Sequence, residues 1–302
     1  MIYDVIIVGG GCAGLTASIY TSRANLNTLL FTGNDIGGLL AKTSIVENFP
    51  GFPDGISGFE LLNNMQIQSE KFGTIIEYDN VLSIEKDNDI FIVNTETNKY
   101  LSKSVIIATG SKPKKIDCIN SDKFENKGIS YCATCDGALF KDKVVSVVGG
   151  GDTAMEEALF LTKFCKKVYL IHRRNKFRAS NIMIDKVVNE PKIKIFYDSI
   201  IYSLDGENKL ENIIIKNVNN DEKTMLYSDG LFVAIGHTPE TNMFNVDKDE
   251  QGYIKIFNNS TSTNIDGIFS CGDCIDPLYR QAVLACGIGC KAGIDCFKYI
   301  NR

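Results

Sequence analysis

Residues 5–14 read VIIVGGGCAG, and the fold can be inferred outward from this segment. The run from Tyr3 to Val8 is apolar and β-branched, which predicts a buried parallel strand, and a helical stretch follows from about Leu15 to Ala24. Glycines placed between such a strand and helix permit a tight turn, backbone approach to a pyrophosphate and close helix packing. The segment therefore predicts a dinucleotide-binding fold. Its phosphates would lie at the helix N-terminus, bound by Gly9, Gly10, Gly11, Cys12, Ala13 and Gly14.

The same pattern occurs a second time, about one domain's length later. Val144 to Val148 predicts a strand, and the stretch from about Thr153 to Phe164 predicts a helix. A repeat at this distance indicates a duplicated domain rather than a solenoid. We therefore expect an α/β protein with two Rossmann-like (three-layer ββα) nucleotide-binding domains. The second pyrophosphate loop would consist of Gly149, Gly150, Gly151, Asp152, Thr153 and Ala154.

Basic residues follow the second strand of the second domain, which we place at Val168 to Ile171. An acid at this point would bind a ribose 2′-hydroxyl, whereas arginines bind a 2′-phosphate. A guanidinium group fits phosphate oxygens and stays charged near neutral pH. The sequence therefore favours NADPH over NADH, the alternative being a solvated basic patch. The residues concerned are His172, Arg173, Arg174 and Arg178.

The second strand of the first domain, Thr28 to Phe31, is not followed by the expected acid. Thr32 or the backbone near Gly33 would then have to bind the ribose of the first nucleotide, with Asp35 as a weaker candidate.

The end of the chain returns to the first domain. A strand from Gly267 to Ser270 leads into Asp273, whose carboxylate can accept hydrogen bonds from ribityl hydroxyls. The following small-residue helix can lie close to a flat ring, with Gln281 at the polar edge of that ring. We therefore expect one domain to consist of residues 1–114 and 247–302, with the other, 115–246, inserted into it.

The segment Cys132-Ala133-Thr134-Cys135-Asp136 lies just before the second glycine loop. Two cysteines at this spacing form a dithiol/disulfide switch, and Asp136 could exchange a proton with a sulfur. A zinc site would need further ligands, and the only histidines, His172 and His237, are distant in sequence. We assign His237 no chemical role. A second such pair, Cys271 and Cys274, is interpreted as small residues at a strand end, the alternative being a second redox pair.

The composition is that of a globular protein, with 302 residues, 44% hydrophobic and 23% charged. A net charge of −5 argues against nucleic acid as a partner. Neither a bilayer-spanning run nor a basic secretory leader is expected. Ten cysteines without a regular framework suggest a reducing cytosol with free, buried thiols. We interpret five of them as apolar filler, namely Cys118, Cys165, Cys286, Cys290 and Cys296.

Taken together, these motifs resemble those of the low-molecular-weight thioredoxin reductases over essentially the whole chain. They include both glycine loops, the Glu47-Asn48-Phe49-Pro50-Gly51 loop, the Cys-Ala-Thr-Cys-Asp-Gly segment at 132–137, the His-Arg-Arg segment and Arg280-Gln281-Ala282. The resemblance implies further FAD contacts at Thr32, Gly33, Gly37, Gly38, Leu39, Asn48, Val81, Ala108, Thr109, Gly110, Gly272, Asp273, Arg280, Gln281 and Ala282, and further NADPH contacts at Ile235 and Gly236. Leu39 stands where the family usually has glutamine, and Cys12 where it usually has proline.

The resemblance also implies a cytoplasmic homodimer that reduces thioredoxin with NADPH through FAD and a Cys132–Cys135 disulfide. Cys135 would face the flavin, Cys132 would attack the partner, and Asp136 would act as general acid/base. The nucleotide domain would rotate between half-reactions, with hinges near Lys112 to Asp117 and Asn242 to Asp247. Two alternatives remain: a flavin disulfide reductase of the same fold, fed by another donor such as ferredoxin or serving a thioredoxin-like partner, and a redox-sensing flavoprotein without rapid turnover.

Overall fold

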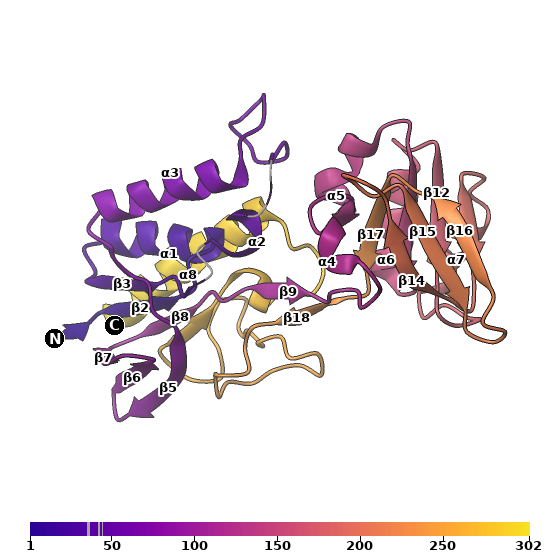
Figure 1. The fold of residues 1–302 in the computed structure, drawn as a ribbon. Coiled ribbons are helices and arrows are strands. Elements are labelled where there is room, and N and C mark those ends of the chain that lie inside the picture. Colours follow the sequence, from indigo (N-terminus) through magenta and orange to yellow (C-terminus); the bar gives the residue numbers. More distant parts are fainter. Residues whose placement is uncertain (35–36, 42, 44) are drawn as a thin grey trace. The chain divides into compact units, whose positions relative to one another are not determined.

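The computed structural model describes residues 1–34, 37–41, 43 and 45–302 (Figure 1). The chain divides into two compact units, Met1–Lys112 with His237–Arg302 (unit 1) and Pro113–Gly236 (unit 2). Among the described residues, no helix is long and apolar enough to cross a membrane. Within the same residues, no three or more His, Cys, Asp or Glu side chains group as metal ligands would.

Unit 1 is built around a five-stranded parallel sheet in the order β19-β8-β2-β3-β4. The central strands are buried on both faces, as expected for a sheet covered on two sides. The five strands are β2 (Val5–Val8), β3 (Thr28–Phe31), β4 (Ile75–Glu77), β8 (Val105–Ile107) and β19 (Ile268–Ser270).

Different layers cover the two faces of this sheet. Ile7 and Leu30 pack on the helical side, whereas the neighbouring Ile6 and Leu29 pack against the small sheet and the segment around Phe244. The helices are α1 (Cys12–Arg23), α2 (Gly38–Ala41), α3 (Gly58–Lys71) and α8 (Ala282–Ile300); the small sheet contains β1 (Ile2–Tyr3), β7 (Lys99–Ser102), β6 (Ile90–Thr95) and β5 (Val81–Asp87). The three-layer ββα arrangement expected from the sequence is therefore confirmed in this unit.

Unit 2 repeats the plan. Its five-stranded parallel sheet has the order β10-β17-β11-β12-β13, and a three-stranded antiparallel sheet has the order β14-β15-β16. One core lies between the parallel sheet and the helices, and the other between the two sheets. The strands are β10 (Ile129–Ser130), β11 (Val144–Gly149), β12 (Lys167–Ile171), β13 (Ile193–Phe196), β14 (Ser199–Asp205), β15 (Asn212–Asn217), β16 (Lys223–Tyr227) and β17 (Gly230–Ala234); the helices are α4 (Ser121–Phe124), α5 (Ala133–Asp136), α6 (Asp152–Leu161) and α7 (Asn181–Val188).

The chain crosses between the units at two places that lie side by side. β9 (Ser111–Pro113) pairs with β18 (His237–Pro239) in a two-stranded ribbon. The second crossing lies at residue 237 rather than at 247, because the intervening residues belong to unit 1: Thr109 donates to the Glu240 carbonyl, and Phe244 and Val246 enter a unit 1 core.

Candidate redox and nucleotide sites

The first glycine loop joins β2 to α1 with very little space around its backbone. Gly9 has φ of +119°, and a side chain there would clash with the Ala108 carbonyl. A Cβ at Gly14 would clash with the Gly9 oxygen, whereas the Cβ position of Gly11 faces open space. Gly11 is the N-cap residue of α1 and makes no side-chain hydrogen bond to the start of the helix. The N–H groups at the start of α1 and the open space at Gly11 together suit a phosphate.

The second glycine loop joins β11 to α6 in the same way. The N-cap residue Gly151 again has no side-chain partner and open space at its Cβ position. Beneath the loop lies the buried His172 ring, so close that a Cβ at Gly150 would clash with it. His172 Nδ1 lies 3.0 Å from the Gly149 oxygen, and Nε2 lies 3.0 Å from the Lys176 oxygen. His172 therefore supports the second glycine loop from below.

The arginine-bearing segment is fastened to this second loop. The Arg178 N–H donates to the Gly150 carbonyl at 2.7 Å. Asp152 Oδ1 accepts hydrogen bonds from the Ser180 N–H and hydroxyl, both at 2.9 Å, and these bonds lower the pKa of the Asp152 carboxyl. These contacts bring the exposed Arg173, Arg174 and Arg178 to the loop that suits a pyrophosphate. Asp152 acts here by tying the loop to the start of α7.

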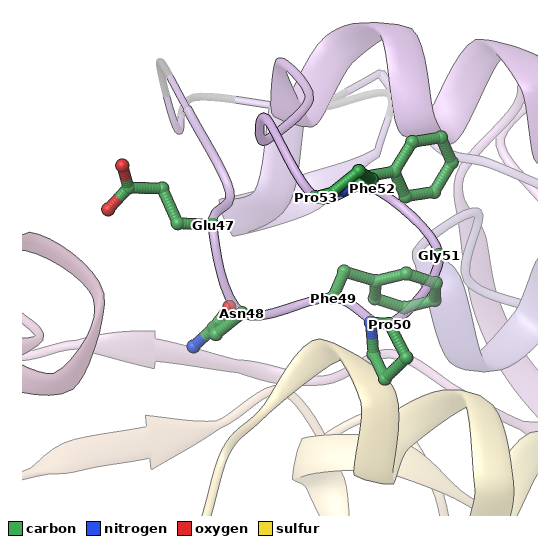
Figure 2. Close-up of a pocket in the computed structure, with 7 residues that line it drawn as sticks. All are labelled: Glu47, Asn48, Phe49, Pro50, Gly51, Phe52 and Pro53. Atoms are coloured by element: carbon green, nitrogen blue, oxygen red, sulfur yellow. The ribbon is translucent and has the colours of Figure 1, made fainter.

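A pocket of about 380 Å³ lies within the 47–53 loop of unit 1 (Figure 2). Its apolar side is formed by Phe49 and Phe52, with ring centroids 6.2 Å apart, and Figure 2 shows Glu47 and Asn48 extending away from them. Asn48 Nδ2 donates to Gln281 Oε1 at 3.1 Å. Gln281 is the N-cap residue of α8, so this bond brings the loop and the start of the small-residue helix together.

Asp273 and Arg280 both lie in the segment that precedes α8. Burial, with a smaller contribution from Asp276, raises the pKa of Asp273 to about 6, and Arg280 opposes the shift. Burial, assisted by Arg280, lowers the pKa of His237 to about 4. The His237 ring is therefore neutral near pH 7.

Some of the other predicted FAD residues, such as Thr32, directly follow strands of the five-stranded sheet of unit 1. Thr32 is buried with its methyl group beneath Gly10, and its hydroxyl donates to the Gly33 carbonyl at 3.0 Å. Its role is thus at least partly to support the loop. Leu39 lies in the short helix α2. The candidate Asp35 lies outside the described residues. The remaining predicted positions in unit 1 are Gly37, Gly38, Val81, Ala108, Thr109, Gly110, Gly272 and Ala282; Ile235 and Gly236 follow β17 in unit 2.

Cys132 and Cys135 form a disulfide in unit 2, with Cα atoms 5.3 Å apart. Cys132 is the N-cap residue of α5, and its Sγ accepts a hydrogen bond from the Cys135 N–H at 3.2 Å. The next residue, Ala133, packs in the same core as Ala154 of α6, which places the disulfide next to the second glycine loop. Both cysteines are only half-buried.

Asp136 ends the same helical turn. Its Oδ2 accepts a hydrogen bond from the Ser130 hydroxyl at 2.6 Å, and its N–H donates to the Cys132 carbonyl at 3.1 Å. Burial raises the pKa of the Asp136 carboxyl, and the bond from Ser130 only partly opposes this shift. A carboxyl that keeps its proton closer to neutral pH is suited to exchange it with a sulfur.

Cys271 and Cys274 belong to different cores, one on each face of the unit 1 sheet. Cys274 Sγ donates to the Cys271 carbonyl at 3.1 Å, and burial raises the pKa of both thiols. Two thiols that point into opposite layers are small core residues, as the sequence suggested, and this arrangement disfavours the alternative of a redox pair.

Comparison with known proteins agrees with this geometry. The pyridine nucleotide-disulphide oxidoreductase family matches residues 3–289. A thioredoxin reductase of Buchnera aphidicola subsp. Schizaphis graminum is 48% identical, covering 98% of this chain and 97% of its own. The structure of thioredoxin reductase from Giardia duodenalis is 41% identical with a TM-score of 0.94, covering 100% and 99%. That from Streptococcus pyogenes is 38% identical with a TM-score of 0.92, covering 99% and 98%. The chain therefore belongs to the pyridine nucleotide-disulphide oxidoreductase family and, within it, to the thioredoxin reductases.

Proposed function

We propose that this chain reduces the disulfide of a thioredoxin, with NADPH as electron donor and FAD as resident cofactor. The observation that carries the proposal is the half-buried Cys132–Cys135 disulfide, which lies beside a carboxyl of raised pKa and next to a nucleotide loop. A structural disulfide would not require either neighbour, whereas a disulfide that opens and closes uses both.

The residues present fit the two nucleotides. The open space at Gly11, the unpaired start of α1 and the Asn48–Gln281 bond suit FAD in unit 1. The corresponding space at Gly151 and the three exposed arginines suit NADPH in unit 2. When bound, FAD supplies the conversion of a two-electron hydride donor into a reductant for a disulfide.

The chain's own groups account for the remaining chemistry. Two electrons and two protons convert the disulfide into the Cys132 and Cys135 thiols. We assign to Cys132 the attack on the partner's disulfide, which forms a mixed disulfide; Cys135 then displaces the partner's sulfur as a thiol. Asp136 holds the proton that each leaving sulfur needs and recovers it from the attacking thiol.

The same proposal includes the domain roles, the assembly and the setting. FAD would bind to unit 1 and NADPH to unit 2, and the ribbon of β9 and β18 would carry the rotation between half-reactions. The working form would be a cytoplasmic homodimer that meets a thioredoxin. Sedimentation of the FAD-loaded protein tests the assembly.

The test of the reaction begins with the FAD-loaded protein. We expect NADPH to bleach the flavin absorbance and oxidised thioredoxin to restore it. Cys135→Ser and Cys132→Ser should each abolish thioredoxin reduction and leave the flavin bound. Cys118→Ser is the matched control, because Cys118 is a half-buried free thiol of the same unit and should not affect turnover. Full turnover by Cys135→Ser would refute the proposal.

The alternative donor, such as ferredoxin, predicts a different outcome. In that case NADPH would leave the flavin oxidised, while a one-electron donor such as dithionite would bleach it. The exposed arginine set at the second glycine loop favours NADPH.

A further inference from the structure

Cys12 and Cys286 meet at one end of the contact between α1 and α8 in unit 1. Cys12 is the first residue of α1, directly after the glycine that suits the pyrophosphate, and Cys286 lies in the second turn of α8. The two thiols are hydrogen-bonded to each other. Cys286 Sγ also lies 3.8 Å from the carbonyl oxygen of Cys12.

Small residues bring the two helices together at this point. A Cβ at Gly289 would clash with the carbonyl oxygen of Ala13, and a Cβ at Gly293 would lie 3.0 Å from that of Ala17. The backbones of α1 and α8 are therefore in direct contact at Ala13 and Gly289. Ala13 is the residue after Cys12, and Gly289 comes three residues after Cys286. Disulfides require Cα atoms about 4.4–6.8 Å apart, and few other helix pairs approach closely enough.

The environment of this pair differs from that of the buried cysteines in unit 1. Cys12 and Cys286 are half-buried, whereas Cys296 lies in the core with a pKa that burial raises to about 12. The hydrogen bond from Cys12 lowers the pKa of Cys286 to about 7, and the same bond raises the pKa of Cys12. The Cys286 thiolate is thus well populated near neutral pH, and the thiolate is the form that reacts with oxidants.

We propose that Cys12 and Cys286 are a second dithiol/disulfide pair, which peroxide oxidises independently of Cys132 and Cys135. The Cys286 thiolate attacks one peroxide oxygen and becomes a sulfenic acid, and the other oxygen leaves as water with a proton taken from solvent. The Cys12 sulfur then attacks the Cys286 sulfur, the S–S bond forms, and the sulfenic oxygen leaves as a second water. Two thiols and one hydrogen peroxide give one disulfide and two waters. The sequence suggested that Cys286 is apolar filler, and this contact with Cys12 is what sets it apart.

The experiment uses the FAD-loaded Cys132→Ser/Cys135→Ser protein, in which the first pair cannot respond. After treatment with hydrogen peroxide, thiols are counted under denaturing conditions, and a non-reduced digest is examined by mass spectrometry. We expect the loss of two thiols and one new cross-linked peptide that joins Cys12 to Cys286, both reversed by dithiothreitol.

Two variants in the same background sharpen the result. Cys12→Ala should abolish the cross-link and slow Cys286 oxidation about tenfold or more near pH 7, because an ordinary thiol has a pKa of about 8.5. Cys290→Ser is the matched control, since Cys290 is a half-buried thiol one turn further along α8 and its loss should leave the cross-link intact. No loss of thiols, a Cys286–Cys290 cross-link, or Cys286 sulfinic acid with Cys12 still free would each overturn the proposal.

Discussion

The glycine loop of unit 1 rests on Thr32, whereas the loop of unit 2 rests on His172. Each supporting residue directly follows the second strand of its sheet, and each lies beneath the second glycine of its loop. Thr32 offers a methyl group, and His172 offers a ring whose two nitrogens face backbone carbonyls. The next residue is Gly33 in one unit and Arg173 in the other. One position thus supports the loop, and we propose that its neighbour decides which ribose is bound.

The third small residue of the loop is Gly14 in unit 1 and Ala154 in unit 2. This difference provides the sharpest test of the loop arrangement that the two units share. Gly14→Ala would place a methyl group against the Gly9 carbonyl, although the second loop carries Ala154 at the same place. We expect loss of bound flavin and a decrease of about 1–3 kcal/mol in the free energy of unfolding. Absorbance of the purified protein and urea denaturation measure these two effects. Ala154→Gly is the matched control and should retain flavin; a fully flavinated Gly14→Ala protein would contradict the close-packing argument.

The difference in ribose recognition is tested at the arginines. Arg173→Gln combined with Arg174→Gln should raise the KM for NADPH about a hundredfold, because charge-assisted bonds contribute about 1.5–3 kcal/mol each. The KM for NADH should barely change, since NADH lacks the 2′-phosphate. Steady-state kinetics with both nucleotides measure the ratio. Lys166→Gln removes a positive charge at the opposite end of the same strand and should leave both constants unchanged.

Asp273 makes FAD binding in unit 1 dependent on pH. Its pKa of about 6 is raised by burial, and hydroxyl donors from a bound ribityl chain would favour the carboxylate. Below pH 6, FAD binding then has to remove the proton from the Asp273 carboxyl. The affinity for FAD should therefore rise about tenfold between pH about 5 and pH about 7 and stay constant at higher pH. Titration of the apoprotein with FAD measures this. Asp273→Asn should bind more weakly with a flat profile, and an equally steep profile in that variant would assign the proton to another group.

His172→Leu should have the smallest effect in the series. It removes two contacts that hold the loop of unit 2, so we expect the KM for NADPH to rise about fivefold while flavin content stays the same. His172→Gln, which keeps a polar group, should restore part of the loss. If His172→Leu raised the KM for NADPH alone as strongly as the arginine changes, the ring would have to contact the nucleotide directly.

The parts of the fold nearest the glycine loops could be predicted from the sequence. The predicted strand Thr28 to Phe31 coincides with β3, and the predicted strand Val168 to Ile171 differs from β12 by one residue at its start. Helix α7 was missed although its residues Met183, Ile184 and Val187 pack in the helical core of unit 2. Strand β14 was missed because its register shifts between Ile201 and Ser203, which interrupts the alternation of side chains.

The chemistry of the candidate sites could be predicted less evenly. The Cys132–Cys135 pair follows from local spacing, and the structure contains this disulfide. The contact of His172 with the glycine loop depends on tertiary packing. In the sequence, His172 stands at the start of a basic segment, and this segment suggested phosphate binding. The sequence did contain one indication, because Thr32 and His172 each come directly after the second strand of their domain. The matching strand registers of β2 with β3 and of β11 with β12 make the two residues equivalent. The contact between Cys12 and Cys286 joins opposite ends of the chain, and no local pattern reveals it.

The paired crossings β9 and β18 have a further consequence for how unit 1 assembles. The chain leaves unit 1 at β9 and returns to it at β18, and these two strands are paired. The two points of unit 1 that unit 2 connects are therefore close together, however long unit 2 is. β8 can consequently pair with β19 in the same sheet although a whole folded unit separates them along the chain. Once unit 2 has folded, it shortens the path between these two strands and lowers the entropic cost of closing the sheet.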